Sequence, residues 1–443
     1  MSKRRNGGII SNRFKLISEL SDFYSDSQDR FLKIELFFKE IAKRFDYSSI
    51  QTPVIENFAL YEKLYAESPF FDKDRFVIFK TKGRKKTVLC LRNELSISMI
   101  RAYCENGLYK KLKPFRLFSF GDEYEIEPDS GHYFRKNKAV FQVFGRKDPV
   151  IEVQLIQFSE FVLNSLNFKG RYKLKINNIG CRKCRRPYVK ALNNFLKTRS
   201  TQLCRDCKKF LKKSPFLVFN CKNVKCAKIY RRAPELLNSL CEECETDFRR
   251  LLKYLDGLGV DYELDSKFFD NFWISNKIVF KFVASDNKGK EKVLISANRR
   301  DEVIKKISSE NTSINNLNFE IDNILADSVL EEGEDFRSEI KGRDNNYSND
   351  NILFIIGLGD KGKQECMKLY FDLIRDDNRV IEFFGKDSMV SQLKRAEKSK
   401  ARFALIIGQK EAIDDMVIIR DLQYGSQETV LRKDLFKRIN KLL

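Results

Sequence analysis

The sequence predicts an α+β protein built from several domains. Patterns typical of helices and of strands alternate over roughly the first 165 residues. A segment with eight cysteines interrupts this alternation between residues 180 and 245. After residue 351, three strand patterns separated by two helical patterns predict a small parallel or mixed α/β domain. A length of 443 residues suits about two to four domains of ordinary size.

The first part of the chain predicts helices interleaved with short strands. Residues 27–45 form a predicted helix, because apolar side chains recur there at helical spacing: Phe31, Leu32, Ile34, Leu36, Phe37, Ile41 and Ala42. A strand around residues 49–52 is expected to end at Pro53. Residues 77–80 and 87–91 flank the basic turn KTKGRKK and predict a hairpin, and residues 91–105 return to helical spacing.

Changes in composition set the expected domain boundaries. Residues 1–178 form the first part of the core, and residues 179–255 form the cysteine-rich insertion. Strand patterns resume at 278–283 and 292–296, so residues 256–329 form the second part of the core. Residues 330–350 are polar and charged and predict a linker, which leaves residues 351–443 for the C-terminal α/β domain.

The charge of the chain favours a polyanionic partner. Lys and Arg number 84 against 62 Asp and Glu, which gives a net charge of +22. Lysine and arginine bind phosphates with release of counterions, so a nucleic acid is the expected partner, although a generally basic proteome is an alternative. The basic N-terminus MSKRRNGG is not followed by an apolar stretch, and no run of about 20 apolar residues occurs. We therefore expect a cytoplasmic protein with no membrane segment.

The clustered cysteines predict structural zinc. The CxxC pairs are Cys181/Cys184, Cys204/Cys207 and Cys241/Cys244, with a looser pair at Cys221/Cys226. Four thiolates close a tetrahedral zinc site, and a reducing compartment disfavours disulfides, so eight cysteines predict two ions. The alternative is that some are small apolar side chains, as expected for Cys90, Cys104 and Cys366. We expect the first two CxxC pairs to share one ion, although the sequence leaves the pairing open.

The C-terminal segment carries a family resemblance. The SQLKRA helix, the strand ARFALIIG and the strand RDLQYGSQETV stand in the order found in the anticodon-binding domain of histidyl-tRNA synthetases, which this segment closely resembles. A basic helix face is usually only solvated, but this resemblance implies contact with tRNA or another RNA. The implied RNA-binding residues are Lys386, Lys394, Arg395, Lys398 and Arg420.

Upstream segments extend the resemblance. IQTPVIENFALYEKL is similar to the first motif of class II synthetases, with Pro53 at the dimer-forming position, which implies a homodimer. LRNELSISMIRAYCENGL resembles the segment that opens the histidine pocket, with Glu94 at the carboxylate that meets the ammonium group and Ser96 at a threonine position. The insertion resembles the family's cysteine-bearing version. The resemblance implies an antiparallel sheet flanked by helices, the zinc-bearing insertion and the terminal α/β domain.

The catalytic motifs of the family are degenerate in this chain. In KPFRLFSFGDEYEIE, Gly121 and Glu127 match the second motif, but its ATP-gripping arginine becomes Glu125, or Tyr124 in a shifted alignment. A unit charge at 4 Å contributes about 4 kcal/mol at an effective dielectric constant near 20, so this reversal opposes triphosphate binding. The third-motif arginine falls nearest Leu325, and a further catalytic arginine aligns with Asp270. The GGGRYD-like turn is SANRRD, which keeps its arginine and aspartate at 299 and 301.

Three functions are compatible with this pattern. The leading hypothesis is a catalytically impaired or inactive paralogue, a pseudoenzyme that binds tRNA or other RNA. The second is an active but divergent histidine–tRNA ligase, which would need ATP and Mg²⁺ and could use Arg135 as a substitute arginine. A synthetase-like regulatory or accessory subunit ranks lower. The candidate pocket residues are Glu94, Ser96, Glu127, Arg135 and Arg299, whereas His132 is expected to be inert.

Overall fold

The architecture is described from a computed structural model of the chain. The structure describes residues 16–17, 20–69, 71–80, 87–111, 114–168, 170–221, 223–269, 272–285, 289–308, 311–327, 352–375, 378–382, 384 and 388–442. The predicted linker, the turn KTKGRKK after its first lysine, Asp270 and Lys386 lie outside these residues.

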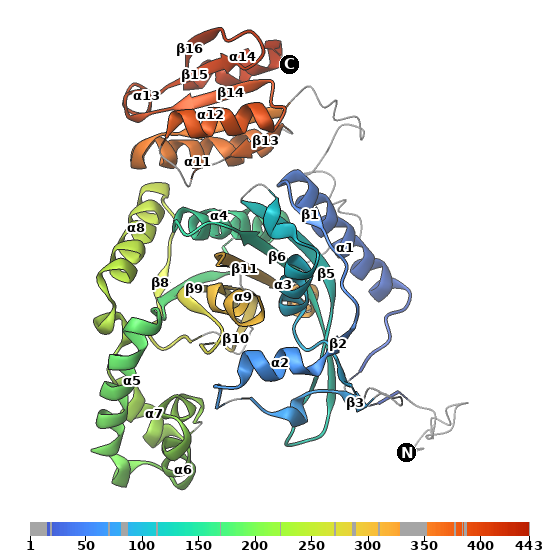
Figure 1. Ribbon diagram of the computed structural model, residues 1–443, viewed down its shortest axis with the longest axis vertical. Helices are drawn as coiled ribbons and strands as arrows, with labels where there is room; N and C mark the ends of the chain where they lie inside the picture. Colours follow the sequence, from blue (N-terminus) through green and yellow to red (C-terminus); the bar gives the residue numbers. More distant parts are fainter. Residues whose placement is uncertain are drawn as a thin grey trace, which may run out of the picture.

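A large mixed sheet forms the centre of the core (Figure 1). Its strands, in spatial order, are β1 (Ser48–Ser49), β5 (Phe115–Ile126), β6 (Tyr133–Phe144), β11 (Ile314–Glu320), β10 (Glu291–Arg299), β9 (Asn276–Ser285), β7 (Lys173–Asn178) and β8 (Glu263–Leu264). The six inner strands pair antiparallel, and the short edge strands β1 and β8 pair parallel. The antiparallel sheet expected from the family resemblance is therefore present.

Helices cover both faces of this sheet. One face packs against α1 (Asp26–Arg44), α4 (Val150–Ser165) and α10 (Ile321–Asp327), where Phe118, Phe141 and Phe319 lie in the main hydrophobic core. The other face packs against α2 (Phe58–Tyr65), α3 (Leu95–Glu105) and α9 (Asp301–Ile307), where Leu117 and Val140 lie in a second core. Successive residues of a strand point to opposite faces, so this division fixes the side on which every polar residue of the sheet lies.

The predicted helix and hairpin of the first part of the chain are confirmed, whereas the strand expected around residues 49–52 is reduced to Ser48–Ser49. Helix α1 buries Ile34, Phe37, Ile41 and Ala42 of the predicted apolar set and leaves Leu32 and Leu36 exposed. The predicted hairpin is formed by β3 (Ile78–Lys80) and β4 (Val88–Leu91), which pair antiparallel in a small sheet completed by β2 (Ile55–Asn57).

The cysteine-rich insertion is helical and has its own hydrophobic core. Its helices are α5 (Arg182–Lys197), α6 (Arg205–Lys213), α7 (Val224–Arg231) and α8 (Glu242–Leu258). Tyr188, Leu192, Phe216 and Leu236 are buried among them. In Figure 1, α6 and α7 lie at the end of the molecule opposite the C-terminal domain, and α8 lies between the two.

The C-terminal domain is a mixed α/β domain, as predicted. Its sheet has the spatial order β13 (Arg379–Glu382), β12 (Ile352–Gly357), β14 (Phe403–Ile407), β15 (Met416–Asp421) and β16 (Gln427–Leu431). The first three strands are parallel and the last two antiparallel. Its helices are α11 (Gly359–Arg375), α12 (Met389–Lys398), α13 (Gln409–Ile413) and α14 (Leu435–Leu442).

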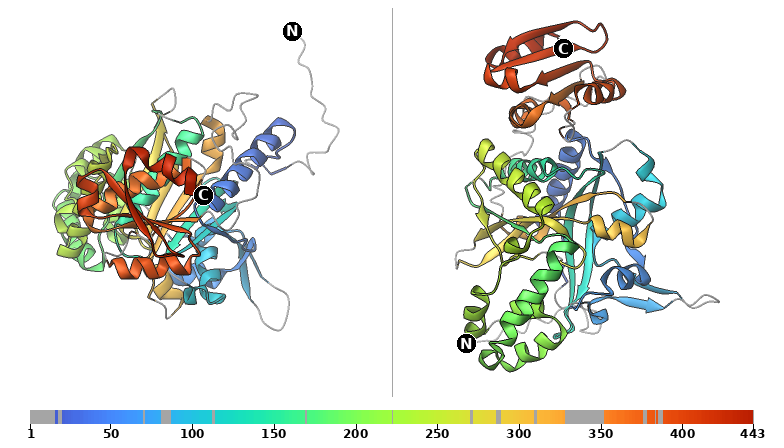
Figure 2. Two further views of the ribbon diagram at one scale, coloured as in Figure 1. Left: turned by 90° about the horizontal axis from the view of Figure 1, so that it is seen from above. Right: turned by 60° about the vertical axis from the view of Figure 1, so that its left-hand side comes forward.

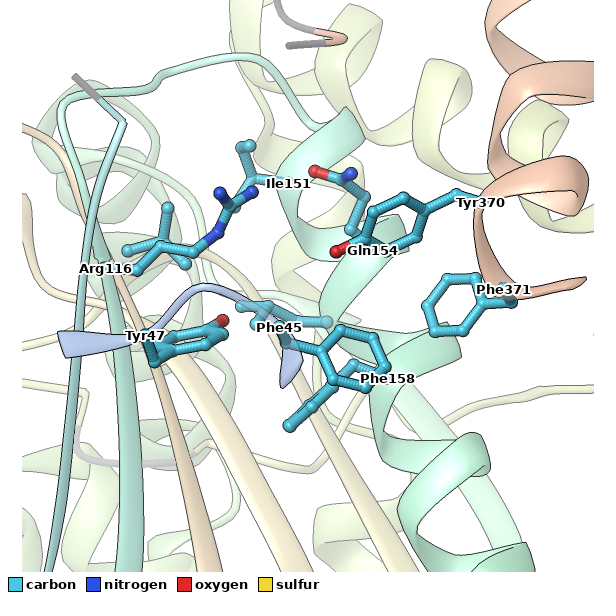
Figure 3. A pocket seen from close by; sticks show the side chains of 10 residues that line it. Phe45, Tyr47, Arg116, Ile151, Gln154, Phe158, Tyr370 and Phe371 are labelled. Atoms are coloured by element: carbon cyan, nitrogen blue, oxygen red, sulfur yellow. The ribbon is translucent and has the colours of Figure 1, made fainter. Parts of the chain in front are cut away.

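This domain packs directly on the core, as the right-hand view of Figure 2 shows. Buried Arg116 of β5 forms an ion pair with buried Glu382 of β13. The aromatic rings of Phe45 and Tyr370 lie 6.0 Å apart beside this pair. Figure 3 shows a small cavity at the junction, lined mainly by aromatic residues and by the polar side chains of Arg116 and Gln154. At a second contact, Tyr254 of α8 donates a hydrogen bond to Asp360 of α11 at 2.7 Å.

The buried ion pair at this junction yields a stability prediction. Glu382→Gln leaves the Arg116 guanidinium buried without its counter-charge, so the free energy of unfolding should fall by roughly 3–5 kcal/mol in urea titrations. The control is Glu35→Gln, which removes the partner of Lys39 in a 2.7 Å pair on the outside of α1. That loss should be much smaller, because exposed pairs contribute little. Equal losses in the two variants would contradict the structural role of Glu382.

Candidate functional site

Several buried polar side chains converge between the large sheet and α3. Glu94, immediately before α3, accepts a hydrogen bond from the Tyr65 hydroxyl at 2.6 Å and pairs with the Arg300 guanidinium. Arg300 also donates to the Ser96 hydroxyl at 2.8 Å and to the Asn298 side chain at 2.7 Å. The Arg300 side chain is fully buried, whereas 15% of the Glu94 side chain is exposed. We call this set of five residues the Glu94 cluster.

Arg300 was not among the residues singled out from the sequence. It follows the last residue of β10 and caps α9, and its backbone N–H donates to Ile314 at 2.8 Å. In the GGGRYD-like turn, Arg300 occupies the position of the motif's tyrosine, and the motif residues that the chain keeps are Arg299 and Asp301. Two successive arginines at the end of a strand could have pointed to Arg300. Because side chains alternate along a strand, one of the two arginines is expected on each face of the sheet.

Arg299 points away from the Glu94 cluster. It is 1% exposed and pairs with Asp301 at 3.0 Å and with Glu152 of α4 at 3.3 Å. It also donates to Ser313 and to the carbonyl of Lys147, both at 3.0 Å. These contacts tie β10 to α4 and to the start of β11, so the structure gives Arg299 a role in packing and does not place it in the candidate pocket.

Charged residues of the β5–β6 hairpin line the same face as Glu94. Glu123 accepts a hydrogen bond from the backbone N–H of Leu95 at 2.8 Å and lies 3.8 Å from the Lys138 ammonium, which pairs more closely with Glu320. Two residues further along β5, Glu125 pairs with Lys136 at 2.5 Å and with Arg75 at 2.8 Å. Glu125, which the family resemblance aligns with the ATP-gripping arginine, is thus a carboxylate with both oxygens engaged by cations.

Tyr124, the residue of the alternative alignment, and Arg135, the possible substitute arginine, lie on the other face of the sheet. Tyr124 and Arg135 are opposite each other in the hairpin register, one residue out of phase with Glu123 and Glu125. Arg135 donates to the carbonyl of Ser21 at 3.2 Å, and its guanidinium lies 4.9 Å from the ring centre of Phe23, on the α1 side. The structure therefore does not bring Arg135 to the Glu94 cluster.

The remaining candidates of the core lie apart from one another. Glu127 is exposed in the turn after β5 and accepts a hydrogen bond from Ser130 at 2.6 Å. Leu325 packs against the main hydrophobic core from α10, and its carbonyl accepts a hydrogen bond from Arg30 at 3.0 Å. Asp270 lies outside the described residues.

Local electrostatics differ sharply between the carboxylates of this face. Burial opposes ionisation of Glu94, but the Arg300 guanidinium outweighs it and lowers the pKa of the Glu94 carboxyl. Burial raises the pKa of Glu123 to about 7, because the more distant Lys138 only partly compensates and Glu94 repels a second negative charge. For Glu125, burial is outweighed by Lys136 and Arg75, so its pKa is lowered.

The cysteines gather into two groups of four. One group is Cys181, Cys184, Cys241 and Cys244, and the other is Cys204, Cys207, Cys221 and Cys226. In the first group the sulfurs of Cys181 and Cys184 are 3.7 Å apart, and those of Cys181 and Cys241 are 3.8 Å apart. Four sulfurs at about 2.3 Å from a tetrahedral zinc ion would be roughly 3.8 Å apart, so both groups have the donors and the spacing for zinc.

The expected pairing of the cysteines was wrong. Cys181 and Cys184 lie at the start of α5, and Cys204 follows its end. A helix of 16 residues extends about 24 Å, so these pairs cannot meet at one ion. The first turn of α8 returns Cys241 and Cys244 to the start of α5, whereas Cys221 and Cys226 complete the distal group. Cys90, Cys104 and Cys366 pack in hydrophobic cores, as expected.

The residues implied in RNA binding do not share one environment. Lys394 and Lys398 are exposed on α12, and Arg420 is partly exposed on β15. Arg395 is half-buried and faces the domain junction, where burial and the charge of Arg116 lower its pKa. Lys386 lies outside the described residues. No helix in the described part of the chain is both long and apolar enough to cross a bilayer.

Opposite pKa shifts at Glu123 and Glu125 predict opposite responses to pH. The folded state holds the Glu123 proton up to about pH 7, whereas the unfolded carboxyl loses it near 4.5. Stability from this group is therefore lost as pH rises through that window. Glu123→Gln, which stays neutral, should be more stable than wild type by about 1–3 kcal/mol at pH 8, and this gain should vanish near pH 5.

Glu125→Gln is the matched control, because its folded-state pKa is lowered. Stability from Glu125 is present above its unfolded pKa and is lost in acid, so this variant should be less stable than wild type at neutral pH. Thermal melting of both variants from pH 4 to 8 is the measurement. The same sign for the two variants at pH 8 would refute the assigned environments.

Comparisons with known proteins agree with this geometry. A family profile described as the anticodon binding domain matches residues 353–442. Histidine–tRNA ligase of Desulfitobacterium hafniense is 28% identical over 391 residues, 88% of this chain and 89% of that protein. The Nitratiruptor enzyme is 27% identical over 428 residues, 96% of this chain and 99% of that protein.

The fold agrees as well. The crystal structure of apo histidyl-tRNA synthetase from S. aureus superposes with a TM-score of 0.56 at 18% identity, covering 96% of this chain and 99% of that one. Its likeness bears on the fold, while the sequence matches span nearly the whole chain. Together with the order of core, insertion and terminal domain, these findings show a histidyl-tRNA synthetase-like protein, similar over nearly its whole length to this family of class II aminoacyl-tRNA synthetases.

Proposed function

We propose that this protein is a catalytically impaired or inactive member of its family that binds tRNA or another RNA. The observation that carries the proposal is the environment of Glu125. This carboxylate stands at the position of the ATP-gripping arginine, on the face of the sheet that holds Glu94. Its oxygens are held by Arg75 and Lys136, so it ties the short 3-10 helix before β3, Lys73–Arg75, to the hairpin instead of being available to a phosphate.

The charge at this position disfavours nucleotide binding. An arginine about 4 Å from a phosphate oxygen would contribute roughly 4 kcal/mol at an effective dielectric constant near 20, and that contribution is missing here because Arg75 and Lys136 are engaged with Glu125. Phosphoryl-bearing transition states depend on preorganised positive groups, so the loss affects adenylate formation more than substrate capture. Arg135, the substitute considered from the sequence, lies on the opposite face of the sheet.

RNA binding is supported by two basic surfaces at the ends of the molecule. The C-terminal domain exposes Lys394 and Lys398 on α12. In the insertion, exposed cations follow α5 and α6: Arg182, Lys183, Arg186, Lys190, Lys197, Arg205, Lys208, Lys209 and Lys212. Asp206 is the exposed acidic residue among the described positions of these two helices. Such surfaces suit a phosphate backbone.

We assign a structural Zn²⁺ ion to each cysteine group. The thiolates leave no position for a reactive water, so the ions would stabilise folding and take no part in catalysis. Cys244→Ser and Cys226→Ser should each reduce the zinc content of the purified protein from two equivalents to about one. Cys104→Ser, outside both groups, should keep two. Elemental analysis of the three variants is the measurement, and full zinc content in either ligand variant would refute the assignment.

A homodimer and a cytoplasmic location complete the proposal. Next to Pro53, the small sheet exposes apolar side chains of β2 and β3: Ile55 at 51%, Ile78 at 36% and Phe79 at 37%. An exposed apolar patch at the family's dimer-forming motif supports self-association. The zinc thiolates require a reducing compartment, which supports the cytoplasm.

The competing function is an active but divergent histidine–tRNA ligase, which would use ATP and Mg²⁺. The family's carboxylate at Glu94 and a hydroxyl at Ser96, at the amino-acid end of the pocket, favour it. Histidine-dependent ATP–pyrophosphate exchange by the purified zinc-loaded protein separates the two functions. The proposal predicts no exchange above background, and exchange at the rate of an ordinary synthetase would refute it.

The RNA-binding part of the proposal has a separate test. Binding of total tRNA should weaken steeply with salt, because phosphate contacts release counterions. Replacing Lys394 and Lys398 together by alanine should weaken binding and reduce the log–log salt slope by about 1–2. The control replaces Lys33 and Lys39, which are exposed on α1. Equal weakening in both double variants would locate the RNA surface elsewhere.

A further inference from the structure

We infer that Arg300 is a built-in ligand of the amino-acid pocket, and that its guanidinium takes the place of a substrate ammonium group at Glu94. The pocket is thereby closed to histidine in the native protein. Once Arg300 is removed, the same site accepts small cations of the guanidinium and ammonium class. This inference rests on the proposed loss of catalysis, but its test does not depend on RNA binding.

Each carboxylate oxygen of Glu94 already has a partner within the chain, so an incoming ammonium group would have to compete with Arg300 for the charge. One carboxylate oxygen accepts the Tyr65 hydroxyl at 2.6 Å, and the other pairs with the Arg300 guanidinium. That second oxygen is also 3.3 Å from the Ser96 hydroxyl. An ammonium group binds through hydrogen bonds to oxygen acceptors, and both oxygens of the only carboxylate in this cluster are already engaged.

Each of the three guanidinium nitrogens of Arg300 has a partner within the chain. Its Nε donates to Asn298 at 2.7 Å, and one terminal nitrogen donates to Ser96 at 2.8 Å while the other contacts Glu94. Its backbone N–H is bonded to Ile314, at the start of β11. The side chain is fully buried. A substrate would therefore have to separate a buried ion pair, and a second cation beside the guanidinium would be repelled.

The sequence context explains how the pocket acquired this charge. In the GGGRYD-like turn, SANRRD places arginine where the family motif has a neutral tyrosine. The preceding strand residue, Arg299, turns to the α4 side, so residue 300 turns to the α3 side where Glu94 lies. A positive side chain at this place meets the carboxylate that would otherwise receive the amino acid.

Another reading is that Arg300 swings out to hold a phosphate and replaces the lost arginine of the second motif. In that case Glu94 would be freed whenever substrate binds, and the wild-type protein would bind histidine. The two readings differ in what the wild-type protein binds and in what a variant without Arg300 gains.

The test is calorimetric titration of wild type and Arg300→Ala with L-histidine and with millimolar guanidinium chloride. Wild type should bind neither compound. Arg300→Ala should bind guanidinium, and guanidinium should raise its melting temperature while leaving that of wild type unchanged. The double variant Glu94→Gln, Arg300→Ala should bind no cation, because the carboxylate is gone. Binding of histidine by wild type, or equal binding of guanidinium by the single and double variants, would overturn the inference.

Removal of a buried guanidinium also threatens folding, so a second variant is needed. Arg300→Tyr restores the neutral residue of the family turn and fills the space. It should bind ammonium chloride through Glu94, as Arg300→Ala should bind guanidinium, and the absence of both responses in folded variants would refute a cation site. Binding of tRNA across the salt series should be the same in these variants as in wild type. If wild type does not bind tRNA at all, that result would count against the proposed RNA-binding function and would leave the inference about Arg300 untouched.

Discussion

The alternation of side chains along the large antiparallel sheet determines which charges meet in this molecule. Each strand of the β5–β6 hairpin has one face toward α3 and the other toward α1. That constraint places Glu123, Glu125 and Lys138 on the same face as the Glu94 cluster, and it places Tyr124 and Arg135 on the opposite face. At the end of β10, it sends Arg299 to α4 and Arg300 to α3. A shift of one residue would exchange all these environments.

The consequence is a pocket whose charges are satisfied internally. Glu94 pairs with Arg300, Glu125 with Arg75 and Lys136, and Glu320 with Lys138. A nucleotide-binding site needs uncompensated positive groups directed at the phosphates, and these cations are already held by carboxylates of the same chain. These polar residues thus stabilise the fold, and exposed lysines and arginines follow α5, α6 and α12, helices that lie toward the two ends of the molecule (Figure 1).

Much of the fold could be predicted from the sequence, because local patterns determine it. Helical spacing identified α1 and α3, and strand patterns identified the β3–β4 hairpin and the terminal α/β domain. The cysteine pairing could not be predicted, because it depends on α5 separating Cys184 from Cys204 and on α8 returning to the start of α5. The position of Arg395 at the domain junction likewise depends on how two domains pack.

The candidate site was predicted only in part, for a related reason. A motif comparison scores whether a residue is retained, so it selected Arg299 and passed over Arg300. Retention does not say what a side chain contacts. Arg299 is retained and serves packing, whereas Arg300 replaces a neutral residue and fills the pocket. The two arginines differ in role because they lie on different faces of the sheet. The face depends on strand register, which is known only once the pairing of the strands is known.

If Arg300 fills the pocket as we propose, it should stay bound to Glu94 when substrates are present in excess. The most direct measurement is a crystal structure of the zinc-loaded protein grown with histidine, ATP and Mg²⁺ in excess. We expect Arg300 to remain bound to Glu94 and Ser96, with no electron density for histidine or adenylate beside them. Histidine with its ammonium group on Glu94, and Arg300 displaced toward a bound phosphate, would refute the closed pocket and favour a divergent but working ligase.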